Sequence, residues 1–261
     1  MIHAALSSAA FLGSSADEVL FAACEAGVTA VEWSSDGFLD PGDRATALRL
    51  MESTLRTGLC ISSYSTLHRI GTYNLVGFDT LVHTALALQA PNIRAWAAPP
   101  GDDGACDRFV EAAKAAGDAA GGNGITLCLA MSPRSLLRWD GRAADLMARV
   151  DHPFVKLCWE PPCDRCFDRA METLEGLSGH VGMIMRRPYP PFDDGLESRQ
   201  EDWLEYLDAV DEQGGSPDMV RYVVIRSYGP HDAPRLAGEV RQIKRMNEML
   251  RRYHRRRVFK T

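Results

Sequence analysis

Residues 92–131 read NIRAWAAPPGDDGACDRFVEAAKAAGDAAGGNGITLCLAM, and they contain one complete strand–helix–strand unit. The apolar run Asn92–Ala97 predicts a strand, and the alanine-rich stretch Cys106–Ala120 predicts a helix. Glycines at 121, 122 and 124 separate this helix from the next predicted strand, Ile125–Met131. Because a helix joins the two strands, they are expected to lie parallel in one sheet.

The same alternation continues along the whole chain. Strands are predicted at Ile2–Leu6, Val28–Trp33, Leu59–Ser65, Asn92–Ala97, Ile125–Met131, Phe154–Trp159, His180–Met185 and Val220–Arg226. Helices are predicted at Ser15–Ala26, Pro41–Thr57, Phe78–Gln89, Cys106–Ala120, Pro133–Val150, Phe167–Leu177, Glu197–Glu212 and Ala233–Arg252. Eight such units in 261 residues predict the α/β class and a single (β/α)8 TIM barrel, which typically needs about 250 residues. A doubly wound sheet is the rival, but no G-x-G-x-x-G motif follows the first strand.

The composition is that of an ordinary globular protein, with 46% hydrophobic and 25% charged residues. No run of 18 apolar residues occurs, so neither a membrane span nor a membrane partner is expected. The N-terminal residues lack the basic segment and long apolar core of a signal peptide. Seven scattered cysteines then fit reduced thiols, and we expect a cytoplasmic protein.

The charge is unevenly distributed. The formal net charge is −6, which argues against nucleic acid as a partner, yet residues 251–260 read RRYHRRRVFK. We therefore divide the chain into a barrel over residues 1–252 and a basic C-terminal tail over residues 253–261. The tail is expected to lie on the acidic surface of its own chain or of a neighbouring one, which leaves a homo-oligomer open.

The predicted strand ends carry a recurring set of short phrases. They are Val31-Glu32-Trp33, Ser63-Tyr64-Ser65 with His68-Arg69-Ile70-Gly71, Ala90-Pro91-Asn92-Ile93-Arg94-Ala95-Trp96, Gly124-Ile125-Thr126-Leu127 and Trp159-Glu160-Pro161-Pro162. In this order and spacing they resemble the xylose isomerase-like TIM barrels, and most nearly the branch of sugar phosphate isomerases and epimerases. The resemblance extends from the first strand to about Leu250.

This resemblance implies a divalent metal, held by glutamates, a histidine and a further polar side chain at the ends of strands five to eight. Carried over onto this chain, those positions fall on Ala130, Glu160, Gly182 and about Val223. Only Glu160 offers a donor atom, and one carboxylate cannot hold a catalytic cation tightly. We therefore expect no cofactor and no metal at the usual site.

The polar side chains inside the barrel suggest what could act instead. Because strand residues alternate between interior and helix layer, Glu160 should share its direction with Lys156, and Arg94 with Trp96. In strand seven the same rule places Ile184 inward, together with Gly182. Glu160 is the candidate acid or base, assisted by His68 or Lys156. The alternative is a set of structural ion pairs, Glu32 with Arg94 above all.

The remaining candidates lie around the mouth and are expected to bind a small carbohydrate-like or anionic substrate. This set consists of Glu32, Trp33, Tyr64, Arg94, Trp96, Trp159, Arg186 and Arg226. The pair Cys163 and Cys166 lacks the further ligands of a zinc site and the fold context of a redox motif, so its role stays open.

Two functions follow from this sequence. The resemblance implies a sugar phosphate isomerase- or epimerase-like protein that acts on a small sugar, polyol or sugar acid, with the metal site largely lost. The alternative is a catalytically inactive barrel that binds a carbohydrate-like ligand or a protein partner. DNA repair by analogy with endonuclease IV is opposed by the acidic balance of the chain.

Overall fold

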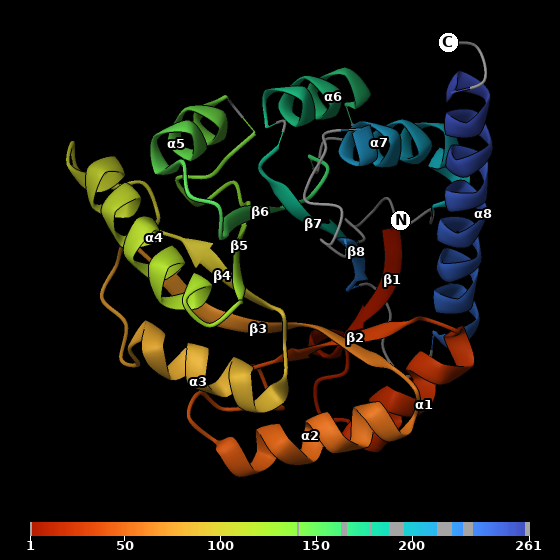
Figure 1. Ribbon diagram of the computed structural model, residues 1–261, viewed down its shortest axis with the longest axis horizontal. Helices are drawn as coiled ribbons and strands as arrows, with labels where there is room; N and C mark the ends of the chain where they lie inside the picture. The colour runs from red at the N-terminus through yellow and green to blue at the C-terminus, as the bar shows by residue number, and fades with distance from the viewer. Residues whose placement is uncertain are drawn as a thin grey trace.

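A computed structural model of the chain describes residues 2–139, 141–162, 166–177, 179–187, 196–212, 221–226 and 232–258, with the backbone only at 212 and 252–258. Eight strands form a closed parallel barrel in chain order, and helices surround it (Figure 1). The predicted (β/α)8 barrel is therefore confirmed, and the open doubly wound sheet is excluded.

The bounds of the elements are as follows. The strands are β1 Ile2–Ser7, β2 Ala30–Ser34, β3 Cys60–Ile70, β4 Asn92–Ala97, β5 Thr126–Ala130, β6 Val155–Trp159, β7 Val181–Arg186 and β8 Arg221–Ile225. The helices are α1 Ala16–Ala26, α2 Arg44–Arg56, α3 Phe78–Leu88, α4 Ala105–Gly121, α5 Arg142–Val150, α6 Phe167–Gly176, α7 Gln200–Glu212 and α8 Ala233–Val258.

Local sequence signals explain several of these bounds. Ser15 and Glu18 form a reciprocal capping box at the start of α1. Helix α2 begins at Arg44 rather than at the predicted Pro41, because the Asp43 side chain accepts a hydrogen bond from the Thr46 amide at 3.0 Å.

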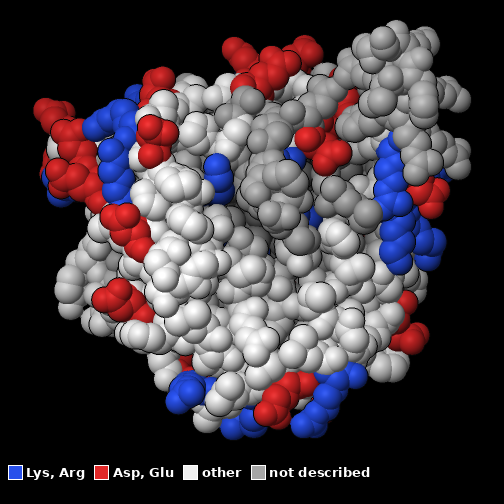
Figure 2. All heavy atoms as spheres, in the orientation of Figure 1, with Lys and Arg blue, Asp and Glu red and all other residues white. Residues whose placement is uncertain are grey.

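The C-terminal helix crosses the predicted boundary between barrel and tail. Helix α8 continues to Val258, so the basic segment 253–258 extends a helix that packs against α1 and β1. Figure 2 shows Lys and Arg side chains gathered over α8. None of the described helices is long and apolar enough to cross a membrane.

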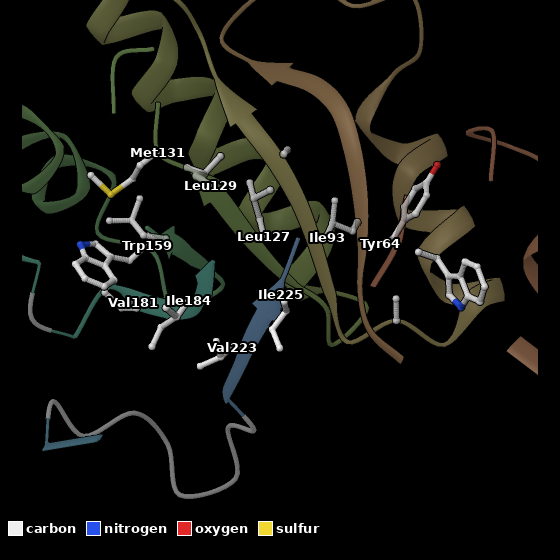
Figure 3. Close-up of a cluster of buried hydrophobic side chains, with 14 of the residues drawn as sticks. Tyr64, Ile93, Leu127, Leu129, Met131, Trp159, Val181, Ile184, Val223 and Ile225 are labelled. Carbon is white, nitrogen blue, oxygen red and sulfur yellow. The ribbon is translucent and has the colours of Figure 1, made fainter. Parts of the chain in front are cut away.

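Side chains that alternate along the strands pack in two different hydrophobic cores. The larger core lies between the strands and the helices and includes Trp159, Ile184 and Val223 (Figure 3). The smaller core fills the barrel interior and consists of Ala5, Ala30, Cys128, Cys158, Met183, Met185, Tyr222 and Val224. Side chains that follow these interior positions toward the carboxyl ends of the strands therefore reach the mouth of the barrel.

A register shift between β6 and β7 corrects part of the predicted alternation. Leu157 pairs with Val181, whereas the next residue, Cys158, pairs with Met183. Met183 and Met185 consequently face the interior, and the prediction that Ile184 does so is wrong. Gly182 lies at the shift itself, where an added Cβ would come within 2.8 Å of the Lys156 Cβ.

This close approach makes Gly182 a sensitive packing position. We expect Gly182→Ala to lower the free energy of unfolding by about 1–3 kcal/mol, because the barrel interior cannot expand locally to admit a methyl group. Urea denaturation measures the change. Gly176→Ala is the matched control, since its Cβ would meet its nearest neighbour, Ala144, at an ordinary 3.8 Å. Equal stability of the two variants would contradict the close packing described here.

Candidate active site

A buried ion pair crosses the barrel between β2 and β4. The Nε of Arg94 donates to Glu32 Oε2 at 2.9 Å, and its second guanidinium nitrogen donates to Oε1 at 2.9 Å. Ser7 and Ser63 donate to the same carboxylate at 2.7 and 2.8 Å, and Arg94 also donates to Ser65 at 2.6 Å. Both charged side chains are almost completely buried. The predicted pairing of Glu32 with Arg94 is confirmed.

The surroundings of Glu32 keep it ionised. Burial alone raises the pKa of Glu32, but the charge of Arg94 and hydrogen bonds from Arg94, Ser7 and Ser63 outweigh it, so the pKa lies below its usual value. Each carboxylate oxygen of Glu32 has two donors, and Arg94 uses its Nε and one terminal nitrogen for this pair. These contacts are those of a structural ion pair, and substrate binding by Glu32 or Arg94 stays a prediction.

Glu160 follows β6 directly and lies at the mouth of the barrel. Its side chain is 6% exposed, and its Oε1 lies 3.5 Å from the Nε of Arg187, which follows β7. Arg226 follows β8, and its amide donates to the Arg186 carbonyl at 2.9 Å. The three side chains therefore come from neighbouring strands at the end of the barrel where active sites lie.

The loop between β5 and α5 fixes the backbone at Glu160. The predicted helix Pro133–Val150 is shorter than expected, since α5 begins at Arg142. The preceding residues fold back across the sheet: the Leu136 amide donates to the Ala98 carbonyl at 2.8 Å, and the Trp139 indole donates to the Glu160 carbonyl at 2.7 Å. Trp139 is thus a positioning residue that the sequence did not suggest.

Strand β3 builds one wall of the mouth. It runs past its predicted end at Ser65 to Ile70, and it pairs irregularly with β4 between Ser65 and Arg69. The Arg69 guanidinium carbon lies 5.9 Å from the centre of the Trp96 ring. Trp96 shares the inward direction of Arg94, and it remains a candidate for substrate contact.

Three aromatic candidates lie on the other side of the sheet. The Trp33 indole donates to Thr54 of α2 at 3.0 Å, and the Tyr64 hydroxyl donates to the Leu39 carbonyl at 2.9 Å. Trp159 packs edge-on against Tyr206 of α7. Because each of the three is one residue away from an inward position, all three point into the helix layer. Their prediction as substrate-binding residues is wrong.

The structure places Arg186 toward α8 rather than at the mouth of the barrel, and it is the next residue, Arg187, that lies at the mouth. Arg186 forms a two-point ion pair with Glu239 of α8, with both N–O distances at 3.2 Å. Glu239 Oε1 also accepts from the Leu196 amide at 3.0 Å, so this pair holds α8 and the segment before α7 against the barrel. Alternation from the inward Met185 identifies Arg187 as the arginine that β7 contributes to the mouth.

The two proposed helpers of Glu160 are too far from it or face elsewhere. Lys156 lies near the amino end of β6, roughly 13 Å from Glu160 at the usual strand rise, and donates to the Gly179 carbonyl at 2.9 Å. His68 packs edge-on against Phe78 of α3, outside the barrel, and burial lowers its pKa. Neither is placed to exchange a proton with a substrate at Glu160.

The described residues of the mouth do not fit a divalent cation. Of the inward residues described at the ends of β5 to β8, Ala130, Met185 and Val224 carry no charge, Arg187 and Arg226 carry positive charge, and only Glu160 is an oxygen ligand. The carried-over positions Gly182 and Val223 are corrected, because Gly182 lies deeper in the barrel and Val223 packs toward the helices. Within the described residues, no three His, Cys, Asp or Glu side chains converge. Cys163 lies outside them, and Cys166 is exposed.

We therefore expect the purified protein to contain no stoichiometric divalent metal at the strand ends. Two guanidinium groups beside a single carboxylate repel a cation. Elemental analysis measures the content, and incubation with EDTA should leave the melting temperature unchanged. One Mn²⁺ or Zn²⁺ per chain that is lost in Glu160→Gln would contradict this reading. A metal retained in that variant would point to the cysteines instead.

Comparison with known proteins finds no matching family model and no matching curated protein. Among solved structures, "L-ribulose 3-epimerase" aligns with a TM-score of 0.74 at 14% identity, over 98% of this chain and 97% of that chain. A xylose isomerase-like TIM barrel protein from Mycobacterium smegmatis, in complex with magnesium, aligns with a TM-score of 0.71 at 16% identity, over 96% and 98%. The probable 3-DHS dehydratase AsbF from Bacillus anthracis aligns with a TM-score of 0.68 at 13% identity, over 93% and 99%. From its first strand to its last helix, the chain has the fold of the xylose isomerase-like TIM barrels.

Proposed function

We propose that the protein is an isomerase- or epimerase-like enzyme that moves a proton next to the carbonyl of a small sugar or sugar acid, without the divalent metal implied by the resemblance. One observation carries the proposal: Glu160 is held nearly buried at the mouth, with a guanidinium 3.5 Å from its carboxylate. The neighbours named as 3-epimerases of L-ribulose and D-allulose support the class of substrate.

The chain's own residues suggest how the transfer would run. Glu160 accepts a proton from the carbon beside the carbonyl, and negative charge then develops on the carbonyl oxygen. The guanidinium of Arg187 or Arg226 stabilises that oxygen, as a fixed positive group does in an oxyanion site. Protonated Glu160 then returns the proton to the same carbon or to the adjacent one. In the second case the hydroxyl proton of the first carbon passes to the former carbonyl oxygen, and the carbonyl moves to the first carbon.

The number of carboxylates favours a transfer between adjacent carbons. Glu160 is the one carboxylate among the inward residues described on β5 to β8. Inversion at a single carbon needs a second acid on the opposite face of the substrate, whereas a shift to the neighbouring carbon needs only one group to carry the carbon-bound proton. Isomerisation is therefore the reaction that this geometry supports best.

Solvent exchange tests the proposal directly. The protein, treated with EDTA, is incubated in D2O with a panel of aldoses, ketoses and sugar acids, and proton NMR follows loss of the signal at the carbon beside the carbonyl. We expect exchange, with conversion, for at least one member of the panel. Binding without exchange for every member would instead support the inactive carbohydrate-binding barrel.

A further inference from the structure

We infer that the substrate carries a carboxylate or phosphate group, and that Arg226 together with Arg187 binds it. The inference rests on the proposed function in one respect, because it takes the same mouth as the place where the substrate binds. It narrows the substrate from carbohydrates in general to sugar acids and sugar phosphates.

The position of the two arginines is the first support. Arg186 of β7 pairs in register with Ile225 of β8, so the next residues of the two strands, Arg187 and Arg226, lie beside each other. The hydrogen bond from the Arg226 amide to the Arg186 carbonyl continues this pairing past the end of β8. Both side chains follow inward neighbours, Met185 and Val224, so both enter the mouth.

The pairing of the buried arginines is the second support. Arg94 and Arg186 each form a two-point ion pair with a glutamate. In the described part of the chain, Arg226 has no comparable partner, since no hydrogen bond or ion pair of its guanidinium is formed there. The Nε of Arg187 is buried without a hydrogen bond, although Glu160 lies 3.5 Å away. Donors therefore remain for a ligand.

The charge balance is the third support. Glu32 and Arg94 neutralise each other below the mouth, and among the described residues above them two guanidinium groups lie beside one carboxylate. Burial, followed by the charges of Arg94 and Arg187, lowers the pKa of Arg226. A guanidinium nonetheless stays protonated at neutral pH, so the described residues of the mouth carry an excess positive charge. An anionic group would relieve this repulsion and accept the remaining hydrogen bonds.

Matched pairs of probes test the inference by isothermal titration calorimetry. D-gluconate is compared with D-glucitol, and D-glucose 6-phosphate with D-glucose, so each pair differs mainly in the anionic group. We expect at least one anion to bind about 10-fold or more tightly than its neutral partner, a difference typical of one charge-assisted contact. The two pairs distinguish a carboxylate from a phosphate.

Two substitutions distinguish direct binding of the anion at the mouth from an effect of the net charge of the protein. Arg226→Gln should weaken binding of the anion about 10-fold or more, because it removes a donor and a charge. Arg56→Gln makes the same change in net charge on α2, at a side chain that is 78% exposed, and should leave binding unchanged. Equal loss in both variants, or no preference for either anion over its neutral partner, including no binding at all, overturns the inference.

Glu160→Gln distinguishes this inference from the proposed function. Removing the negative charge beside Arg187 should strengthen anion binding, while the proposed proton transfer should disappear. Anion binding by a protein that never exchanges protons would leave the inference standing and refute the proposed function. Proton exchange on neutral sugars, without tighter binding of the anions, would support the proposed function and refute the inference.

Discussion

Glu160→Gln is expected to lower turnover of the exchanging sugar by about 100-fold or more, which is the usual scale of general acid–base catalysis. Glutamine keeps the shape of the side chain but cannot accept the proton. The carbonyl of this residue would still accept the Trp139 indole hydrogen bond at 2.7 Å, and Pro161 and Pro162 still restrict the chain that follows. The position of the side chain should therefore survive the substitution.

The same variant should melt within a few degrees of the wild type. Its ion-pair partner Arg187 is 29% exposed, so water can solvate the guanidinium when the carboxylate is removed. Rates by NMR and melting by calorimetry, measured on one preparation, test both parts. Loss of about 3–5 kcal/mol of stability would instead identify Glu160 as the partner of a buried cation. A variant with wild-type turnover and wild-type melting temperature would show that Glu160 is not the catalytic residue.

Glu32→Gln is expected to destabilise the fold by about 3–5 kcal/mol, because it leaves the charge of Arg94 buried without a counter-charge. Urea denaturation at neutral pH measures the loss. The matched control is Glu52→Gln, which breaks an ion pair with Arg56 whose side chains are 57% and 78% exposed, and should cost about 1 kcal/mol or less. Similar losses in the two variants would show that the buried pair has no special role.

The pH dependence of stability provides a second measure of the same pair. The fold lowers the pKa of Glu32 from its usual value of 4.5, so the ionised form contributes stability at pH values above 4.5. That contribution is lost as the pH falls from 4.5 through the lowered pKa. Wild-type stability should therefore decline with acid more steeply than that of Glu32→Gln. If stability falls equally with pH in the wild type and in Glu32→Gln, the pKa of Glu32 is not lowered in the fold.

The architecture could be predicted from the sequence because each strand–helix unit carries its own signals. Capping groups, glycines and apolar periodicity are local, and the eight units leave few ways to close a sheet. Prediction of the site also requires the direction in which each strand side chain points, into the barrel or toward the helices. With Glu32 and Glu160 inward, strict alternation already turns Trp33 and Trp159 outward, so those two errors were avoidable.

Other parts of the site could not be obtained from alternation. The register shift after Leu157 reverses the expected direction of β7, and it exchanges Arg186 for Arg187 at the mouth. The contact from Trp139 to Glu160 joins segments separated by 21 residues through a loop without periodicity. Both features depend on how neighbouring strands and loops pack, which one segment of sequence does not encode by itself.

The buried pair and the candidate site draw on opposite halves of the barrel. Glu32, Arg94 and their three serine partners come from β1 to β4, whereas Glu160, Arg187 and Arg226 follow β6 to β8. Substitutions at Glu160, Arg187 or Arg226 therefore remove none of the hydrogen bonds that hold the Glu32–Arg94 pair. Residues that contact a ligand can therefore be substituted without removing the ion pair that joins β2 to β4. The ends of β6 to β8 are accordingly the positions to randomise in a library designed for new ligands.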